Sequence, residues 1–254
     1  MKKIALITGA TSGIGKATAE LFAQKGIHLI LCGRRQERLE QIAQALAPAT
    51  QVLTLCFDVR NLEQVNQMLN TLPQDWQNID ILINNAGNAH GLEPIQTANI
   101  NDWDAMIDIN VKGLLYVSQW VIPRMTARKA GHIVNIGSIA GKEVYPKGNV
   151  YCASKFAVDA LTQGMRIDLN PFGIKVSQVA PGLVETEFSL VRFKGDAERA
   201  KKVYEGYQPL TAHDIAETIW YIVSAPAHVQ IADVVILPTA QASATIVNKN
   251  QTQN

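Results

Sequence analysis

The chain has 254 residues, of which 47% are hydrophobic and 18% charged, and its formal net charge at pH 7 is +1. This balance gives no reason to expect nucleic acid or an anionic membrane as a partner. No apolar run approaches the ~20 residues of a membrane span, and the N-terminal apolar run leads into a glycine-rich turn rather than a leader cleavage site. The odd number of cysteines, widely spaced at Cys32, Cys56 and Cys152, is typical of reduced thiols, so we expect a cytoplasmic protein.

Short apolar runs alternate with helix-period segments along the chain. The predicted strands are Lys3–Thr8, His28–Cys32, Gln51–Phe57, Asp80–Asn84, His132–Ile136, Lys175–Ala180 and Asp233–Leu237. The predicted helices are Gly13–Lys25, Gln36–Leu46, Leu62–Leu72, Ile100–Lys129, Tyr151–Leu169 and His213–Ser224. Because the strand runs are apolar throughout rather than alternating, both faces of each strand should be covered. We predict an α/β fold: a single-domain, Rossmann-like, doubly wound sheet of about seven parallel strands with helices on both faces.

This domain should span residues 1–247, followed by a polar C-terminal tail at 248–254. Two segments read as insertions, 87–101 after the fourth strand and a second after the sixth. The second, 183–207, is placed to cover a substrate, because ligands of such folds bind at the carboxyl ends of the strands.

A glycine-rich turn stands between the first strand and the first helix. It comprises Gly9, Ala10, Thr11, Ser12, Gly13, Ile14 and Gly15. Its glycines allow a sharp turn and close approach of a pyrophosphate, while the helix that follows offers unpaired amides and a positive dipole end. The position of the turn, rather than the glycines alone, indicates a dinucleotide site.

The end of the second strand indicates which dinucleotide binds. An NAD enzyme usually carries an acidic residue there to accept the ribose hydroxyls, whereas this chain has Gly33 followed by Arg34 and Arg35. Arginines can grip a 2′-phosphate with paired, charge-assisted hydrogen bonds. Two cations at a helix start are otherwise unfavourable, so the pattern predicts NADP rather than NAD.

Tyr151 and Lys155 lie on one face of a predicted helix in a Tyr-x-x-x-Lys pattern. An isolated tyrosine has a pKa near 10, and an ammonium ~4 Å away could lower it by roughly three units. The oxidised nicotinamide adds a second positive charge, so Tyr151 could exchange a proton with a substrate hydroxyl near physiological pH. Ser138, at the end of the fifth strand, could donate to the substrate oxygen, and Asn110 is an unfavourable choice in mid-helix unless it has another role.

Further motifs fall at strand ends: Asp58-Val59, Asn84-Asn85-Ala86-Gly87 and Pro181-Gly182-Leu183-Val184-Glu185-Thr186. With these motifs in order from Lys3 to about Leu237, the sequence resembles the short-chain dehydrogenase/reductase family. The resemblance implies a catalytic set of Ser138, Tyr151 and Lys155, with Asn110 holding a water that links Lys155 to solvent. It implies that the NADP contacts, besides the turn, the arginines, Tyr151 and Lys155, come from Asp58, Val59, Asn85, Ala86, Gly87, Pro181, Gly182, Val184 and Thr186.

The substrate is indicated by a narrower resemblance. The stretches GRRQERL, NAGNAHGLEP, EFSLVRFKGD and the LP-T-AQ ending resemble the NADP-dependent 3-hydroxy acid dehydrogenases, which act on L-serine, L-allo-threonine and related compounds. A hydroxy acid needs a cation for its carboxylate, and Arg192 is the candidate, unless it is solvated or paired with Glu185 or Glu187. Lys147 is a second candidate.

Two other functions stay open. The same chemistry could serve larger apolar ketones or steroids, or the fold could be a non-catalytic NADP-binding sensor. No His/Cys/Asp cluster has metal-ligand spacing, so no metal is predicted. Apolar residues in the two longest helices, beyond what one sheet face can bury, lead us to expect a homotetramer, as the family resemblance also implies.

Overall fold

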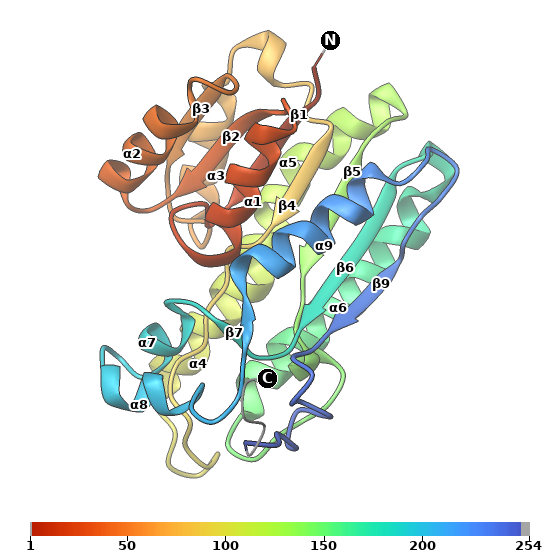
Figure 1. Ribbon diagram of the computed structural model, residues 1–254. Helices are drawn as coiled ribbons and strands as arrows, with labels where there is room; N and C mark the ends of the chain where they lie inside the picture. Colours follow the sequence, from red (N-terminus) through yellow and green to blue (C-terminus); the bar gives the residue numbers. More distant parts are fainter. Residues whose placement is uncertain (1, 250–254) are drawn as a thin grey trace.

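The predicted parallel sheet is present in the computed structural model, which describes residues 2–249. Seven strands lie side by side in the order β3-β2-β1-β4-β5-β6-β9, and every neighbouring pair is parallel (Figure 1). The strands are β1 Ile4–Thr8, β2 His28–Gly33, β3 Val52–Cys56, β4 Ile81–Asn84, β5 His132–Ile136, β6 Lys175–Pro181 and β9 Asp233–Ile236. Their bounds agree with the predicted ones to within one residue.

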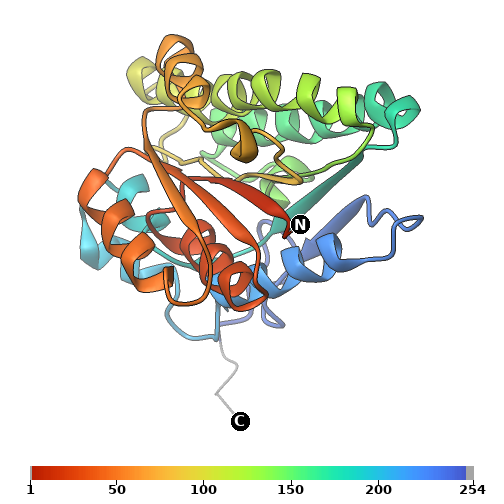
Figure 2. The ribbon, with the colours of Figure 1, turned by 90° about the horizontal axis from the view of Figure 1, so that it is seen from above.

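The strands β1 to β6 contribute to two separate hydrophobic cores, which explains their unbroken apolar runs, while the edge strand β9 packs against one core only. In β1, Ile4 and Leu6 face one core, while Ala5 and Ile7 face the other. The first core lies under α3, α5 and α6, and the second under α1, α2 and α9, so the helices form a layer on either face (Figure 2). The bounds of these helices are α1 Gly13–Gln24, α2 Gln36–Leu46, α3 Leu62–Asn70, α5 Gly113–Arg128, α6 Asn149–Leu169 and α9 Ala212–Ser224.

The long helix predicted over Ile100–Lys129 is not continuous. It consists of α4 (Ile100–Ile107), a π-helical turn at Asp108–Lys112, and α5. A π turn inserts one extra residue per turn, which rotates the side chains that follow and is frequent at functional positions. The periodicity of the sequence does not reveal it, because both flanking segments are ordinary α-helix.

The segment predicted as a lid, 183–207, begins in a small two-stranded sheet that is separate from the main sheet. Here β7 (Val184–Glu185) pairs in parallel with β8 (Leu210–Thr211). The short helices α7 (Phe188–Arg192) and α8 (Ala197–Lys202) follow β7 and lie near α4 beyond the carboxyl ends of the strands (Figure 1). We refer to residues 183–207 as the lid. Of the predicted polar tail, residues 250–254 lie outside the described part of the chain.

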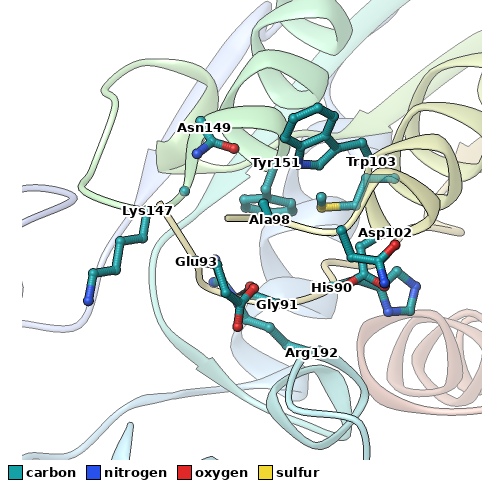
Figure 3. Close-up of a pocket in the computed structure, with 13 residues that line it drawn as sticks. His90, Gly91, Glu93, Ala98, Asp102, Trp103, Lys147, Asn149, Tyr151 and Arg192 are labelled. Atoms are coloured by element: carbon teal, nitrogen blue, oxygen red, sulfur yellow. Dashed lines mark hydrogen bonds between the residues drawn. The ribbon is translucent and has the colours of Figure 1, made fainter. Parts of the chain in front are cut away.

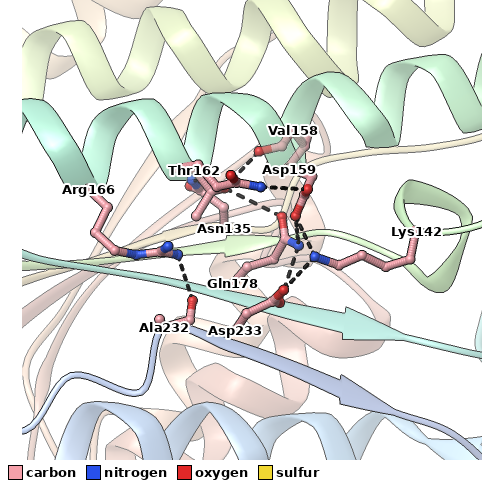
Figure 4. Close-up of polar contacts among 10 residues, drawn as sticks. Asn135, Lys142, Val158, Asp159, Thr162, Arg166, Gln178, Ala232 and Asp233 are labelled. Carbon is pink, nitrogen blue, oxygen red and sulfur yellow. Dashed lines mark hydrogen bonds and ion pairs between the residues drawn. The ribbon is translucent and has the colours of Figure 1, made fainter.

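Polar side chains tie α6 to the second half of the sheet (Figure 4). Asn135 of β5 donates to the Thr162 hydroxyl over 2.9 Å, and Gln178 of β6 donates to the Asp159 carboxylate over 2.8 Å. Lys142 donates to the same carboxylate over 2.5 Å. Because Asn135 and Gln178 are buried, these bonds fix α6 in position against β5 and β6. Within residues 2–249, no helix is long and apolar enough to cross a membrane.

The buried His132 of β5 predicts an acid-sensitive fold. Burial lowers its pKa from 6.5 to about 4, and its Nε2 lies 2.8 Å from the Ser177 hydroxyl. The unfolded chain therefore binds a proton at higher pH than the folded chain, so stability is lost as pH falls from 6.5 to about 4. Over this window, protonation of His132 should lower the free energy of unfolding by about 3 kcal/mol.

His132→Gln should make the free energy of unfolding, measured in urea, less dependent on pH across this range than it is in the wild type. His213→Gln, at an exposed histidine paired with Glu217, is the control, and equal slopes for the wild type and His132→Gln would contradict the prediction.

Candidate active site

The motifs that end successive strands converge because the strands are parallel. The glycine-rich turn follows β1, Arg34 follows β2, Asn85 follows β4 and Ser138 follows β5. All follow the carboxyl ends of parallel strands, on the side of the sheet where the lid lies (Figure 1). The predicted cofactor and catalytic residues therefore share one face of the molecule.

The glycine-rich turn packs closely against the segment that follows β4, whereas the first amides of α1 have no side-chain cap. A Cβ on Gly9, whose φ is +66°, would lie 2.9 Å from the Ala86 Cα atom, and a Cβ on Gly15 would lie 2.5 Å from the Gly9 carbonyl oxygen. The Asn85 side-chain amide donates to the carbonyls of Thr8 and Gly9, which fixes the turn. No side chain caps the first amides of α1. The turn can thus offer backbone amides and a positive dipole end to a diphosphate.

The end of β2 has no room for the carboxylate of an NAD site. A Cβ on Gly33 would lie 2.8 Å from the Thr11 methyl group, so a larger residue would force Thr11 to move. Arg35 instead reaches over the turn and donates to the Thr11 hydroxyl over 2.7 Å and to the Ser12 hydroxyl over 2.8 Å. The Arg34 side chain is 54% exposed, with Nη1 3.6 Å from Asp58 Oδ2. These two guanidinium groups fit a 2′-phosphate.

Two charged residues beside this site were given other roles or none by the sequence analysis, which named Glu187 only as a possible partner of Arg192 and did not single out Arg38. Glu187, in the lid, accepts a hydrogen bond from Arg35 Nη1 over 2.9 Å and another from Arg38 Nη1 over 2.8 Å. Hydrogen bonds from the two arginines hold the pKa of Glu187 below its usual value. Sequence gave no signal for this contact, because the lid and α2 lie far apart along the chain.

The three residues of the predicted catalytic set lie together and are buried. The exposed fractions of Ser138, Tyr151 and Lys155 are 9%, 8% and 7%. Tyr151 and Lys155 come from the first two turns of α6, and Ser138 immediately precedes the short 3₁₀ turn that packs against this helix. Lys155 Nζ donates to the Ile136 carbonyl over 3.0 Å and lies 6.0 Å from the centroid of the Tyr151 ring.

The pKa of Tyr151 is not lowered in the protein alone, which lacks the positive charge of the nicotinamide that the expectation includes. Burial raises the pKa of Tyr151, and the hydrogen bond with Ser138, which lowers it, does not compensate. Burial also lowers the pKa of Lys155 to about 8. Desolvation is the largest influence on both pKa values because both groups are enclosed. Any acidification of the phenol needs a further positive charge in the site.

Asn110 lies in the π turn, where its side chain is buried and makes three hydrogen bonds. Its Oδ1 accepts from the Asn88 amide, and its Nδ2 donates to the Asn88 carbonyl and to the Ser154 hydroxyl, each over 2.9 Å. Gly87 brings Asn110 close to Lys155: a Cβ there would lie 2.9 Å from Asn110 Oδ1 and 3.6 Å from Lys155 Nζ. The two residues are neighbours without a direct hydrogen bond between them.

A pocket opens beside Tyr151, and Arg192 at the end of α7 is one of its walls (Figure 3). Arg192 donates to the Tyr145 hydroxyl over 2.7 Å and to the Gly91 carbonyl over 3.2 Å, with its guanidinium carbon 5.5 Å from the centroid of the Tyr151 ring. Across residues 2–249 it forms no ion pair, so the expected alternative of a pairing with Glu185 or Glu187 does not occur. Lys147 also lines the pocket, but its side chain extends away from Arg192 (Figure 3).

The remaining predicted cofactor residues differ in accessibility. Thr186 lies over the glycine-rich turn, with its Cβ 3.3 Å from where a Cβ on Gly13 would be. Val59 is 6% exposed and packs against Gly113, so its side chain belongs to the core. Pro181, at the end of β6, is buried. Cys152 is a packed free thiol, as expected, and no metal-binding cluster occurs among residues 2–249.

Comparison with known proteins shows the family. The model of the short chain dehydrogenase family matches residues 3–196, and the chain belongs to this family. It is 46% identical over 242 residues to the NADP-dependent 3-hydroxy acid dehydrogenase YdfG of Salmonella typhi, covering 95% of this chain and 97% of the relative. It is 44% identical over 243 residues to sulfoacetaldehyde reductase 2 of Chromohalobacter salexigens, with 95% and 96% covered.

The structural comparison agrees. The closed form of a serine dehydrogenase complexed with NADP⁺ superimposes with a TM-score of 0.91 at 45% identity, covering 95% of this chain and 97% of that chain. The serine dehydrogenase from Escherichia coli gives a TM-score of 0.82 at 40% identity, covering 94% and 99%. The predicted fold class and family are confirmed.

Because the ammonium of Lys155 is buried, we expect its charge to lower the free energy of unfolding. Below pH 8 the folded protein carries this charge at a cost on the order of 3 kcal/mol, because its pKa is lowered from 10.5 to about 8. Lys155→Met removes the charge but leaves the Ile136 carbonyl without its donor, which costs about 1 kcal/mol. At pH 7 the variant should melt several degrees higher than the wild type. Wild-type stability should also rise between pH 8 and 10.5, because the unfolded chain binds more protons there, and the variant should lack this rise.

The control for this experiment is Lys16→Met in α1, since the Lys16 side chain is 49% exposed and forms an ion pair with Glu20 on the helix surface. It should leave the melting temperature unchanged within a degree or so. A lower melting temperature for Lys155→Met at pH 7 would show that the hydrogen bond outweighs the buried charge.

Proposed function

We propose that this protein is an NADP-dependent oxidoreductase that transfers a hydride between the nicotinamide and a small 3-hydroxy acid such as L-serine or L-allo-threonine, or in reverse to the corresponding oxo acid or aldehyde. The observation that carries the proposal is the position of Arg192. Its guanidinium stands at the ring of Tyr151 without an acidic partner in the described chain. An unpaired cation beside a proton-exchanging phenol fits a substrate whose hydroxyl and carboxylate lie close together.

The cofactor is proposed from the fit of the residues at the carboxyl ends of β1 and β2. The amides at the start of α1 suit the diphosphate, and Arg34 and Arg35 suit the 2′-phosphate, while Gly33 leaves no place for a competing carboxylate. When bound, NADP supplies the hydride chemistry, and the oxidised nicotinamide supplies positive charge. Asp58, Asn85, Ala86, Gly87, Gly182, Val184 and Thr186 are proposed as further contacts. Val59 and Pro181 would contribute only through their backbones, because their side chains are buried.

The proton chemistry is assigned to Tyr151. Its phenol exchanges a proton with the substrate oxygen, and Ser138 donates a hydrogen bond to that oxygen as charge develops on it. Lys155 holds positive charge near the phenol, although burial alone keeps the tyrosine pKa high. Asn110 is proposed to hold a water that links Lys155 to solvent, which its place beside Gly87 and Lys155 supports. The protein thus contributes position and charge.

The relatives support an acidic substrate. They are named for 3-hydroxy acids, for serine and for sulfoacetaldehyde, each of which carries an anionic group. A single guanidinium can bind a carboxylate or a sulfonate through paired hydrogen bonds. Reduction of larger apolar ketones is the second candidate. A non-catalytic sensor is disfavoured because Ser138, Tyr151, Lys155 and Asn110 are all retained.

We also propose a homotetramer in the cytoplasm. The tetramer is supported by large apolar side chains on exposed positions of two elements, namely Phe156 and Ile167 on α6 and Val235 on the edge strand β9, with exposed fractions of 41%, 73% and 47%. Such exposed apolar groups on one long helix and one open edge suit contacts between copies. The cytoplasm is supported by the free thiols of all three cysteines.

A substrate panel with matched variants tests the proposal. L-Serine, 3-hydroxypropionate, sulfoacetaldehyde, propionaldehyde and a steroid ketone are compared by the absorbance of NADPH. Arg192→Gln should raise KM for the charged substrates roughly 10- to 100-fold, because a hydrogen bond to a charged group is worth about 1.5–3 kcal/mol, and should leave propionaldehyde unaffected. Lys147→Gln should change neither, and Tyr151→Phe should be inactive. Turnover of the steroid ketone without any hydroxy acid turnover would refute the proposal.

The cofactor preference is tested separately. Arg34→Ala should raise KM for NADP by at least about tenfold while changing KM for NAD little, because only the former carries the 2′-phosphate. Equal losses with both cofactors would mean that Arg34 does not bind the 2′-phosphate.

A further inference from the structure

Glu187 of the lid forms ion pairs with two arginines, Arg35 and Arg38, that lie 152 and 149 residues earlier in the sequence. It stands between Thr186 and the first residue of α7, and it holds Arg35 and Arg38 with one carboxylate oxygen each, over 2.9 and 2.8 Å. Arg35 precedes α2, and Arg38 lies in its first turn. The contact therefore clamps the lid onto the segment that carries the 2′-phosphate arginines.

Arg35 is shared between the lid and the glycine-rich turn. Its Nε and Nη2 donate to the Thr11 hydroxyl, Nη2 also donates to the Ser12 hydroxyl, and Nη1 donates to Glu187. A guanidinium held by three fixed acceptors has little freedom left, because its donors form a planar fork. Glu187 is thus bound to an arginine that the rest of the site already positions.

The other end of α7 carries Arg192. This helix has only five residues, Phe188–Arg192, so its two ends are only about 7–8 Å apart. Arg192 donates to Gly91 and Tyr145, and the Phe188 ring lies 5.7 Å from that of Tyr151. The clamp at Glu187 and the guanidinium beside Tyr151 therefore lie at the two ends of one short helix, which is held by contacts at both ends.

We propose that Glu187 is a positioning residue: by binding Arg35 and Arg38 it holds α7 closed and sets Arg192 at the substrate carboxylate. This inference rests on the proposed role of Arg192. Arg35, a proposed contact of the cofactor, then also helps to position the substrate by binding Glu187. Glu187 itself contacts the reacting atoms of neither ligand. Each ion pair is about half exposed, so the effect of its loss is a modest change in affinity rather than a loss of chemistry.

The test compares Glu187→Gln with Glu185→Gln in the NADP-loaded enzyme. Glu185 is an exposed acid in the same segment, and it forms no ion pair in the described chain. For Glu187→Gln, KM for 3-hydroxypropionate should rise roughly three- to tenfold, with kcat not lowered and KM for NADP not raised. Glu185→Gln should match the wild type. An unchanged KM, or a lower kcat at unchanged KM, would overturn the proposal.

Arg38→Gln provides a second arm, because Arg38 contacts Glu187 without contacting the glycine-rich turn. It should raise KM in the same direction. The double variant Arg38→Gln/Glu187→Gln should be no worse than Glu187→Gln alone, since both changes remove one interaction. Additive effects would mean that the two residues act separately. The ratio of variant to wild-type KM should also shrink in 1 M salt, which screens exposed ion pairs.

Hydrogen–deuterium exchange of the lid separates this inference from the proposed function, because it requires no substrate. With NADP bound, amides in residues 188–203 should exchange faster in Glu187→Gln than in the wild type and Glu185→Gln. Faster exchange with no hydroxy acid turnover by the wild type would sustain the clamp and refute the substrate. Unchanged exchange would overturn the clamp, even if hydroxy acids are turned over.

Discussion

The site exists because seven parallel strands end at the same edge of one sheet. Parallel pairing requires a crossover helix after each strand, and the helices then cover both faces, which leaves the carboxyl ends as the place where polar loops can gather. The glycine-rich turn, the arginines, the Asn85 anchor, Ser138 and the start of α6 all depend on this geometry. Side chains of β1 that alternate between two cores fix the register on which these loop positions rest.

Burial governs the chemistry at this edge more than charge does. Tyr151 and Lys155 are enclosed by α6, the lid and the turn after β5, and each is shifted toward its neutral form. A phenol in this state is a poor base until more positive charge enters the site. The burial that raises the pKa of Tyr151 also lowers the local dielectric constant, so that charge introduced with a ligand acts strongly on the phenol.

Much of this could be predicted from the sequence, for identifiable reasons. Strand bounds were accurate to a residue because strands buried on both faces are continuous apolar runs ended by glycine or polar residues. Ser138, Tyr151 and Lys155 could be named because motif spacing on a helix fixes their relative position. Three features could not be predicted. The π turn at Asn110 breaks no pattern of hydrophobicity, the pKa of Tyr151 depends on enclosure by distant segments, and the partnership of Glu187 with Arg38 joins residues that only the folded chain brings together.

The shortness of α7 determines which of its residues are free to vary. A helix of five residues has almost no stability of its own, so its anchors maintain it and its intervening residues are dispensable to the sheet. Leu190 and Val191, at 40% and 43% exposure, contribute little to either core. Substitutions at these two exposed positions should therefore leave both cores in place. Sequence variation in the lid should be tolerated there, between the contacts of Glu187 at one end of α7 and those of Arg192 at the other.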